Sequence, residues 1–508
     1  MNQAPQTGFF GQPAGLRTLF FAEMWERFSY YGMRAILVLF MTAPIAAGGF
    51  GWTPAKAGPV YGVYTSMVYL LALPGGWIAD RVLGARKSVF WGGVIIMLGH
   101  ISLAVPSINS FYLGLVLIVI GVGLLKPNIS TMVGQLYAPE DERRDAGFSI
   151  FYMGINLGAM ISPLVVGYLA QSEGWRATLS SWGIRPETSW HWGFGATAVG
   201  MFLGLIWYVV DRKSLGEAGL HPAVTSPEDA VIAKRKLWRS LTGVAAALVI
   251  VCGLQAAGVI ALTTTSVSNI FGVGLLVLVV VFFAWLFLSA NWTPEERRRL
   301  VVILVLFLGA AVFWSVFEQA GSTLTLFAQN STRNSVFGHE FPSSWWQSIN
   351  SGWIVVLAPV FAWIWVWLGR RNPSSPAKFA IGLLLVALSF YIMVPAAVLA
   401  NGGHRVGWWW LMSSYFLATA GELSLSPVGL SAMTRLAPKR VASLMMGVWF
   451  LADSVGNFIG GRVAGVYEKF SLPTLFGGVA TYALIFAVIL ALLVNPIKRM
   501  LAQSETAG

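Results

Sequence analysis

Nine ionisable residues interrupt stretches that are otherwise apolar, and through them this chain could do chemistry. They are Glu23, Glu26, Arg27, Arg34, Lys126, Glu318, Glu422, Asp453 and Arg462. One charge at the centre of a membrane helix costs about 2.5–3.5 kcal/mol. Nine unpaired charges would cost about 20–30 kcal/mol, more than the roughly 5–15 kcal/mol that stabilises a typical domain. These groups must therefore pair with one another or face water, as in an ion or substrate pathway.

The first apolar segment carries four of these charges on one face. At about 100° per residue, Glu23, Glu26, Arg27, Tyr30 and Arg34 lie together over three helical turns, and the opposite face is apolar. A face of this kind must look into a protein interior or an aqueous cavity, because lipid cannot solvate it.

Three later segments repeat this pattern. A polar stripe surrounds Glu318 and consists of Trp314, Ser315, Ser322, Thr325 and Gln329. Another helical face carries Tyr415, Glu422 and Ser426. Lys126 directly precedes Pro127, which frees a backbone carbonyl, and this is tolerated where a helix lines a cavity. We interpret these charges as a pathway, whereas for Asp453 and Arg462 we favour structural ion pairs that close helix contacts.

Aromatic residues lie in apolar segments beside the charges. They are Tyr30, Tyr31, Tyr69, Trp314 and Trp449. They could shape a substrate pocket, and packing in the protein core remains the alternative. No metal or cofactor is expected, because Cys252 is the single cysteine and the five histidines show no paired spacing.

The elements that must position these residues are membrane helices. The chain of 508 residues is 56% hydrophobic and 11% charged, whereas soluble proteins carry roughly 25% charged residues. Apolar runs long enough to cross a bilayer predict fourteen spans. They lie near 18–43, 57–81, 88–106, 111–135, 146–171, 190–211, 240–262, 268–290, 300–328, 344–369, 377–400, 408–434, 442–467 and 474–495. The fold class is therefore an all-α membrane protein.

The distribution of basic residues predicts the orientation. The N-terminus lacks the pattern of a cleavable signal peptide. With the N-terminus inside, most of the 33 Lys and Arg residues fall in inner segments. The outer segments hold only Lys56, Arg176, Arg185, Arg333, Arg405 and Lys469. By the positive-inside rule both termini are cytoplasmic, and the net charge of +12 needs no nucleic-acid partner.

A polar segment divides the chain into two halves. Residues 212–239 follow the sixth span and are expected to form a cytoplasmic linker. A weak internal repeat relates 156–167 to 454–465. We therefore expect a six-helix bundle at 1–211, two inserted membrane helices at 240–290 and a second six-helix bundle at 291–508. Related halves that meet around a midplane site are a transporter architecture.

At these residues the sequence resembles the proton-dependent oligopeptide transporters, a branch of the major facilitator superfamily. The segment EMWERFSYYG (23–32) matches the family's ExxERFxYYG motif. Further matches are GGWIADRVLGARK (75–87), GLLKPN (123–128), DAGFSIFYMGINLGA (145–159), FWSVFEQAGSTL (313–324), QSIN (347–350) and GELSLSPVGLS (421–431). The resemblance runs from about residue 17 to 499. It implies the superfamily fold with two extra helices between the halves, as in bacterial members.

The resemblance also implies a function and residue roles. The chain would be a multi-pass inner-membrane symporter that imports di- and tripeptides with protons, acting as a monomer in the lipid bilayer. Arg27, Arg34 and Lys126 would hold the peptide carboxylate, and Glu422, Asn156 and Asn350 its amine. Tyr30, Tyr69, Trp314, Trp449 and Ser426 would shape side-chain pockets. Proton movement would involve Glu23, Glu26 and Glu318.

One competition for a buried charge would then couple the proton to the peptide. The resemblance implies that Glu318 pairs with Arg34, so protonation of Glu318 would release Arg34 to the substrate carboxylate. Animal members carry a proton-binding histidine in the second helix. No histidine occurs between residues 1 and 99 here, so Glu23, Glu26 and Glu318 would bind the proton instead.

Other functions fit the sequence less well. A carrier of nitrate or a drug-like compound in the same fold remains the alternative, although nitrate needs no acid such as Glu422 to bind an amine. A membrane-embedded enzyme would need a His or Asp pair, or a Ser–Lys or Ser–His couple, near the membrane face. In the spans no buried histidine sits beside a serine or an acid, and we expect the buried acids to belong to one cavity. A channel would not require charges of both signs in two related halves.

Overall fold

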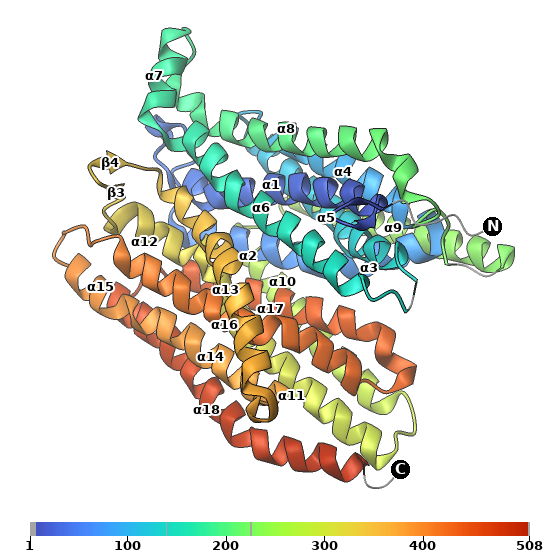
Figure 1. Ribbon diagram of the computed structural model, residues 1–508. Helices are drawn as coiled ribbons and strands as arrows, with labels where there is room; N and C mark the ends of the chain where they lie inside the picture. Colours follow the sequence, from blue (N-terminus) through green and yellow to red (C-terminus); the bar gives the residue numbers. More distant parts are fainter. Residues whose placement is uncertain (1–6, 139, 224–225, 506–508) are drawn as a thin grey trace. The chain divides into compact units, whose positions relative to one another are not determined.

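The structure is a computed structural model that describes residues 7–138, 140–223 and 226–505. The described chain is almost entirely helical (Figure 1). Its α-helices are α1 (Gly15–Thr42), α2 (Pro54–Leu70), α3 (Ala72–Ile78), α4 (Ala85–Leu103), α5 (Ile108–Gln135), α6 (Arg144–Gln171), α7 (Glu173–Ser181), α8 (Ser189–Val210), α9 (Pro227–Ala256), α10 (Thr264–Leu288), α11 (Pro294–Phe317), α12 (Thr323–Ser331), α13 (Gln347–Leu368), α14 (Ser375–Tyr391), α15 (Met393–Ala400), α16 (Trp409–Leu436), α17 (Met445–Ala464) and α18 (Leu472–Glu505).

Short elements connect these helices. The single-turn helices and the π-helical turn η2 are η1 (Ile45–Ala47), η2 (Ala79–Leu83), η3 (Pro186–Thr188), η4 (Arg212–Leu215), η5 (Glu318–Gly321), η6 (Ser343–Trp346), η7 (Gly369–Arg371) and η8 (Lys439–Leu444). Strand β1 (Thr7–Phe9) pairs antiparallel with β2 (Gln12–Pro13), and β3 (Ser335–Val336) pairs antiparallel with β4 (His339–Glu340).

The expected membrane spans are confirmed. Among the described residues, 10 helical segments are long and apolar enough to cross a bilayer. Four further long helices, α1, α4, α16 and α17, coincide with the remaining expected spans. Polar and charged residues lower the apolar character of these four. The all-α membrane fold that the sequence predicts is therefore present.

Three spans that were expected to be continuous are broken. The segment 300–328 divides into α11, η5 and α12, with Ser322 at φ −135° and ψ −84°. Breaks also separate α2 from α3 and α14 from α15. Helix α9 begins at Pro227, inside the expected linker, because Ser226 caps it and a proline suits the first helical position. Helix α7 was not expected.

The helices gather into two compact units. The first unit comprises Met1–Tyr31, Leu70–Ser162 and Phe194–Ile270, and the second unit comprises Gly32–Tyr69, Pro163–Gly193 and Phe271–Gly508. Each unit takes segments from several parts of the chain. The division into two six-helix bundles, a linker and two inserted helices, with boundaries at 211, 239 and 290, stays a prediction.

Glycines let helices α4 and α5 pack tightly in the first unit. A Cβ atom on Gly92 would lie 2.7 Å from the Gly121 carbonyl oxygen, and one on Gly99 would lie 2.9 Å from that of Gly114. The segment after α8 is held against the same unit. The Arg86 guanidinium donates to the carbonyl oxygens of Gly216 and Ala218. This packing holds α5, the helix that carries Lys126, closely against α4.

In the second unit, α14 packs against both α16 and α18, and α11 packs against α17 (Figure 1). Helix α2 crosses α17 with almost no space between the backbones. A Cβ atom on Gly461 would lie 2.2 Å from Gly62 Cα, and one on Gly58 would lie 2.4 Å from Gly465 N. We call this contact of Gly58 and Gly62 with Gly461 and Gly465 the glycine crossing. Both pairs show the GxxxG spacing that permits close helix contact in membranes.

Candidate substrate and proton site

The first unit contains a buried ion cluster made within one helix. Arg27 Nε lies 3.1 Å from Glu23 Oε1, one helical turn earlier on α1, and it also pairs closely with Glu26. All three side chains are at least 95% buried. The second amino group of Arg27, Nη2, has no hydrogen-bond partner among the described residues. Two carboxylates therefore compensate the charge of one guanidinium, and its Nη2 amino group is left to donate to a ligand.

The other predicted residues of the first unit lie on α1, α5 and α6. The Arg27 guanidinium lies 5.4 Å from the centroid of the buried Tyr30 ring, and the Tyr31 ring packs edge-on against Tyr30. Lys126 is half-buried on α5. Asn156 is buried on α6, where its amide nitrogen donates to the Tyr152 carbonyl at 3.0 Å.

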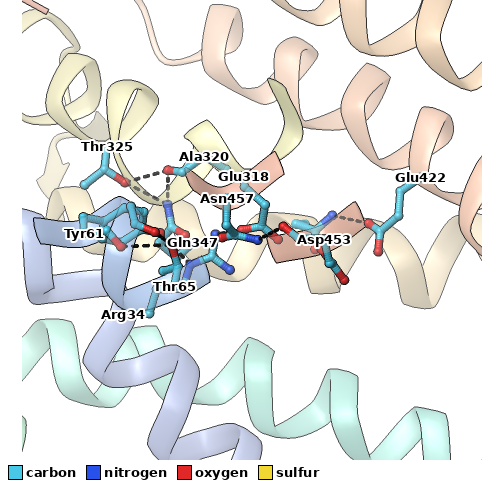
Figure 2. A network of polar contacts seen from close by, with 12 residues as sticks. Arg34, Tyr61, Thr65, Glu318, Ala320, Thr325, Gln347, Glu422, Asp453 and Asn457 are labelled. Atoms are coloured by element: carbon cyan, nitrogen blue, oxygen red, sulfur yellow. Dashed lines mark hydrogen bonds and ion pairs between the residues drawn. The ribbon is translucent and has the colours of Figure 1, made fainter. Parts of the chain in front are cut away.

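The second unit contains a buried ion pair between residues far apart in the sequence. Arg34 of α1 pairs with Glu318 of η5, and its Nε donates to the Tyr61 hydroxyl of α2 at 2.8 Å. Both charged side chains are about 93% buried or more. Figure 2 shows Arg34 between Tyr61 and Glu318. The pairing of Arg34 with Glu318 that the family resemblance implies is therefore present.

A second carboxylate, Glu422 of α16, lies in the same unit. The amide nitrogen of Asn350 on α13 donates to Glu422 Oε2 at 3.0 Å and to the Thr419 hydroxyl at 3.0 Å. Ser426, one helical turn after Glu422, is half-buried. The polar face predicted for this helix thus presents an acid that is hydrogen-bonded to a neutral amide.

The predicted aromatic residues of the second unit are buried. The Trp314 ring lies edge-on to Trp449, with 6.4 Å between their centroids. The Tyr69 ring centroid lies 6.5 Å from that of Phe450. The structure brings Trp314 and Trp449 together and places Tyr69 against another ring.

Several contacting residues were not predicted from the sequence. Tyr61 binds Arg34, and Gln347 contacts the broken helix near Glu318, although Gln347 lies in a motif that the resemblance identified. The polar stripe around Glu318 is not one helical face, because the helix breaks there. Asp453 is buried on α17 and Arg462 is exposed, so a structural ion pair for each stays a prediction.

Among the described residues, no three His, Cys, Asp or Glu side chains are grouped so that they could hold a metal ion. Among the candidate residues, Arg27 and Arg34 pair with carboxylates, and Glu422 pairs with an amide. Such pairs can exchange one partner for a carboxylate or an amine from a ligand.

Comparisons with known proteins agree on one family. The model described as "POT family" matches residues 86–482. The chain is 40% identical to peptide transporter YePEPT of Yersinia enterocolitica, over 98% of this chain and 97% of that protein. It is 38% identical to the di-/tripeptide transporter of Lactococcus lactis subsp. cremoris, over 99% of each.

A solved structure has the same fold. It is the crystal structure of a mutant of peptide transporter POT in complex with alafosfalin, with a TM-score of 0.87 and 40% identity. The match covers 98% of this chain and 97% of that chain. This agreement confirms the expected major facilitator superfamily fold.

Proposed function

Because this chain belongs to the POT family, we propose that it is a proton-coupled symporter that imports di- and tripeptides by alternating access. It is a multi-pass membrane protein of a transporter family. In this proposal it acts as a monomer in the cytoplasmic (inner) membrane, with both termini cytoplasmic, and it catalyses no chemical reaction on the peptide.

The buried pair of Arg34 and Glu318 is the observation that carries the proposal. Separating such a pair by removing one charge costs about 3–5 kcal/mol, because the other charge stays buried. When the pair separates, a proton would neutralise the charge of Glu318, and a peptide carboxylate would neutralise the charge of Arg34. Each ligand would lower the cost of binding the other, which is thermodynamic coupling.

We assign the carboxylate end of the peptide to the cationic residues. Arg27 has an N–H group to offer, Lys126 is half-buried, and Arg34 becomes available when Glu318 is protonated. In this proposal Glu23 and Glu26 stay paired with Arg27 and participate in proton movement.

The amine end of the peptide is assigned to Glu422 together with Asn350 and Asn156. Glu422 is a half-buried anion whose amide partner can shift to a peptide group. The rings of Tyr30, Tyr31, Tyr69, Trp314 and Trp449, with Ser426, would surround the peptide side chains. Because the charges read only the ends of the peptide, many side chains would be accepted.

Uptake of labelled dialanine into proteoliposomes tests the proposal, with acid outside and the interior electrically negative. We expect uptake against the gradient that a protonophore abolishes. Uptake of labelled nitrate or of a labelled peptide-like drug, without any dialanine uptake by folded protein, would instead favour another small substrate in the same fold.

The variant Glu318→Gln tests the coupling step. Glutamine cannot take up a proton, so we expect proton-driven accumulation to be lost while exchange of labelled for unlabelled dialanine continues. Full accumulation by Glu318→Gln would show that another group couples the proton.

A further inference from the structure

The helix break beside Glu318 exposes backbone groups that a continuous helix would bond internally. Helix α11 ends at Phe317, η5 covers Glu318–Gly321, and α12 begins at Thr323. At such a break, carbonyl groups need partners from side chains. The Ala320 carbonyl accepts from the Thr325 hydroxyl at 2.7 Å.

Gln347 supplies a second donor to the same carbonyl. Its amide nitrogen lies 2.5 Å from Ala320 O, 2.8 Å from Thr325 Oγ1 and 3.1 Å from the Tyr415 hydroxyl. Figure 2 shows this amide directed at Ala320 and Thr325. Gln347 is the first residue of α13, and Tyr415 lies on α16. One side chain therefore joins the turn η5 to two other helices.

The turn η5 has little freedom on its other side. A Cβ atom on Gly321 would lie 2.1 Å from the Tyr61 hydroxyl and 2.9 Å from Arg34 Nε. The turn is thus held between Gln347 on one side and the Arg34–Tyr61 pair on the other. A small displacement of the turn would change the separation of Glu318 and Arg34 directly.

On the basis of the proposed function, we propose that Gln347 is a positioning residue for proton coupling, which holds η5 where Glu318 can pair with Arg34. Gln347 itself carries no proton and contacts neither charged group in this role. Its amide fixes the backbone that presents the carboxylate.

Other ionisable groups lie in the same region of the second unit. Figure 2 draws Arg34, Tyr61, Glu422 and Asp453 together with Glu318, and the Tyr415 hydroxyl accepts from the Gln347 amide. Of these, Arg34 makes the direct ion pair with Glu318. Loss of Gln347 should therefore act mainly by weakening this pair, which would let the Glu318 carboxyl take up a proton at higher pH.

Titration of the purified variant Gln347→Ala by infrared spectroscopy tests this inference. The carbonyl band of protonated Glu318 is identified by its disappearance in Glu318→Gln. We expect its titration midpoint in Gln347→Ala to move to higher pH by about one unit, a tenfold change in proton affinity. An unchanged midpoint in folded Gln347→Ala would overturn the proposal, whatever the transported substrate is.

Gln171→Ala is the matched control. The Gln171 amide also bridges segments of the second unit, since it lies 3.2 Å from both Ser343 Oγ and Gln329 Oε1. None of these contacts involves η5. We expect Gln171→Ala to leave the midpoint of Glu318 unchanged, and an equal shift in both variants would show a general loosening instead of positioning.

A transport measurement then connects the inference to coupling. In proteoliposomes that take up dialanine, we expect Gln347→Ala to shift the pH dependence of proton-driven uptake in the same direction as the infrared midpoint. Exchange of dialanine should fall less than proton-driven uptake. Absence of uptake in the wild type would reject the proposed function, while the infrared result would still decide the role of Gln347.

Discussion

Arg27 and Arg34 lie on the same helix, yet their partners come from different distances along the chain. Arg27 pairs with Glu23 and Glu26 of its own helix α1. Arg34 pairs with Glu318, which is 284 residues away, and with Tyr61 of α2. The first cluster persists wherever α1 is helical. The second exists only while α1, α2 and the turn η5 are assembled.

This difference separates a charge cluster within one helix from a contact between distant segments of the chain. A pair within one helix cannot report how helices move, because its geometry is fixed by the helix. A pair between distant segments has two states, made and broken, and a ligand can bias it. We therefore expect the pair of Arg34 and Glu318 to respond when helices move, whereas the cluster around Arg27 keeps its geometry.

The largest expected effect comes from Arg27→Ala. This change leaves Glu23 and Glu26 buried without their cation, whereas Arg34→Ala leaves only Glu318. Breaking a buried pair costs about 3–5 kcal/mol, so we expect Arg27→Ala to be less thermally stable than Arg34→Ala. Thermal unfolding of both variants in detergent measures this difference. Equal losses of stability would remove the distinction between the two arginines.

A smaller effect is expected from Gly62→Leu, which should disturb Arg34 and spare Arg27. A side chain at Gly62 would force α2 away from Gly461. Tyr61, which lies on α2 and contacts Arg34, would move with the helix. Overpacking of this kind costs about 1–3 kcal/mol. We expect lower thermal stability and weaker proton coupling.

Gly478→Leu in α18 is the control for this change, because a Cβ atom there meets nothing within 4 Å. The two variants add the same side chain to a helix in the same unit. If Gly62→Leu were no more disruptive than Gly478→Leu, the glycine crossing would not hold α2 in place.

The sequence predicts the local cluster better than the distant one. The helical spacing alone places Glu23, Arg27 and Arg34 on one face, and insertion costs require that they be paired. The partner of Arg34 came only from the family resemblance. Nothing in the spacing of Tyr61 indicates that its hydroxyl reaches Arg34, because that contact depends on tertiary packing.

The membrane spans were predictable because hydropathy and length determine them. The breaks in 300–328 and near Leu71 were not, because an apolar run reads the same whether its helix is continuous or interrupted. The break at Glu318 is stabilised by Gln347 and Tyr415, which lie far away in the sequence. Side chains at such distances leave no periodic signal.

The smallest expected effect comes from Asp211→Asn, which breaks a more exposed pair of the same chemistry. Arg17 Nη2 lies 2.7 Å from Asp211 Oδ1, and the arginine side chain is 40% exposed. Burial alone would raise the pKa of the Asp211 carboxyl, but hydrogen bonds from Arg17 and Thr18 outweigh it and leave that pKa below its usual value.

A lowered pKa in the folded protein means that the contribution of Asp211 to stability is present above about pH 3.9, the unfolded value, and is lost in stronger acid. We expect Asp211→Asn to lower stability at pH 7 by less than about 1 kcal/mol, with the difference vanishing as the pH falls below the lowered pKa of the folded carboxyl. Thermal unfolding across this range measures it. A stability difference that varied between pH 5 and 8 would show that the Asp211 carboxyl titrates in that range, and it would contradict the lowered pKa.

The glycine crossing has a consequence for how this protein can vary. No amino acid is smaller than glycine, so every replacement of Gly58, Gly62, Gly461 or Gly465 adds atoms. Random mutation at these four positions therefore pushes α2 and α17 in one direction only, apart. In a core of larger residues, a substitution that adds volume at one site can be offset by one that removes volume at the next. No such compensating substitution is available at these four glycines.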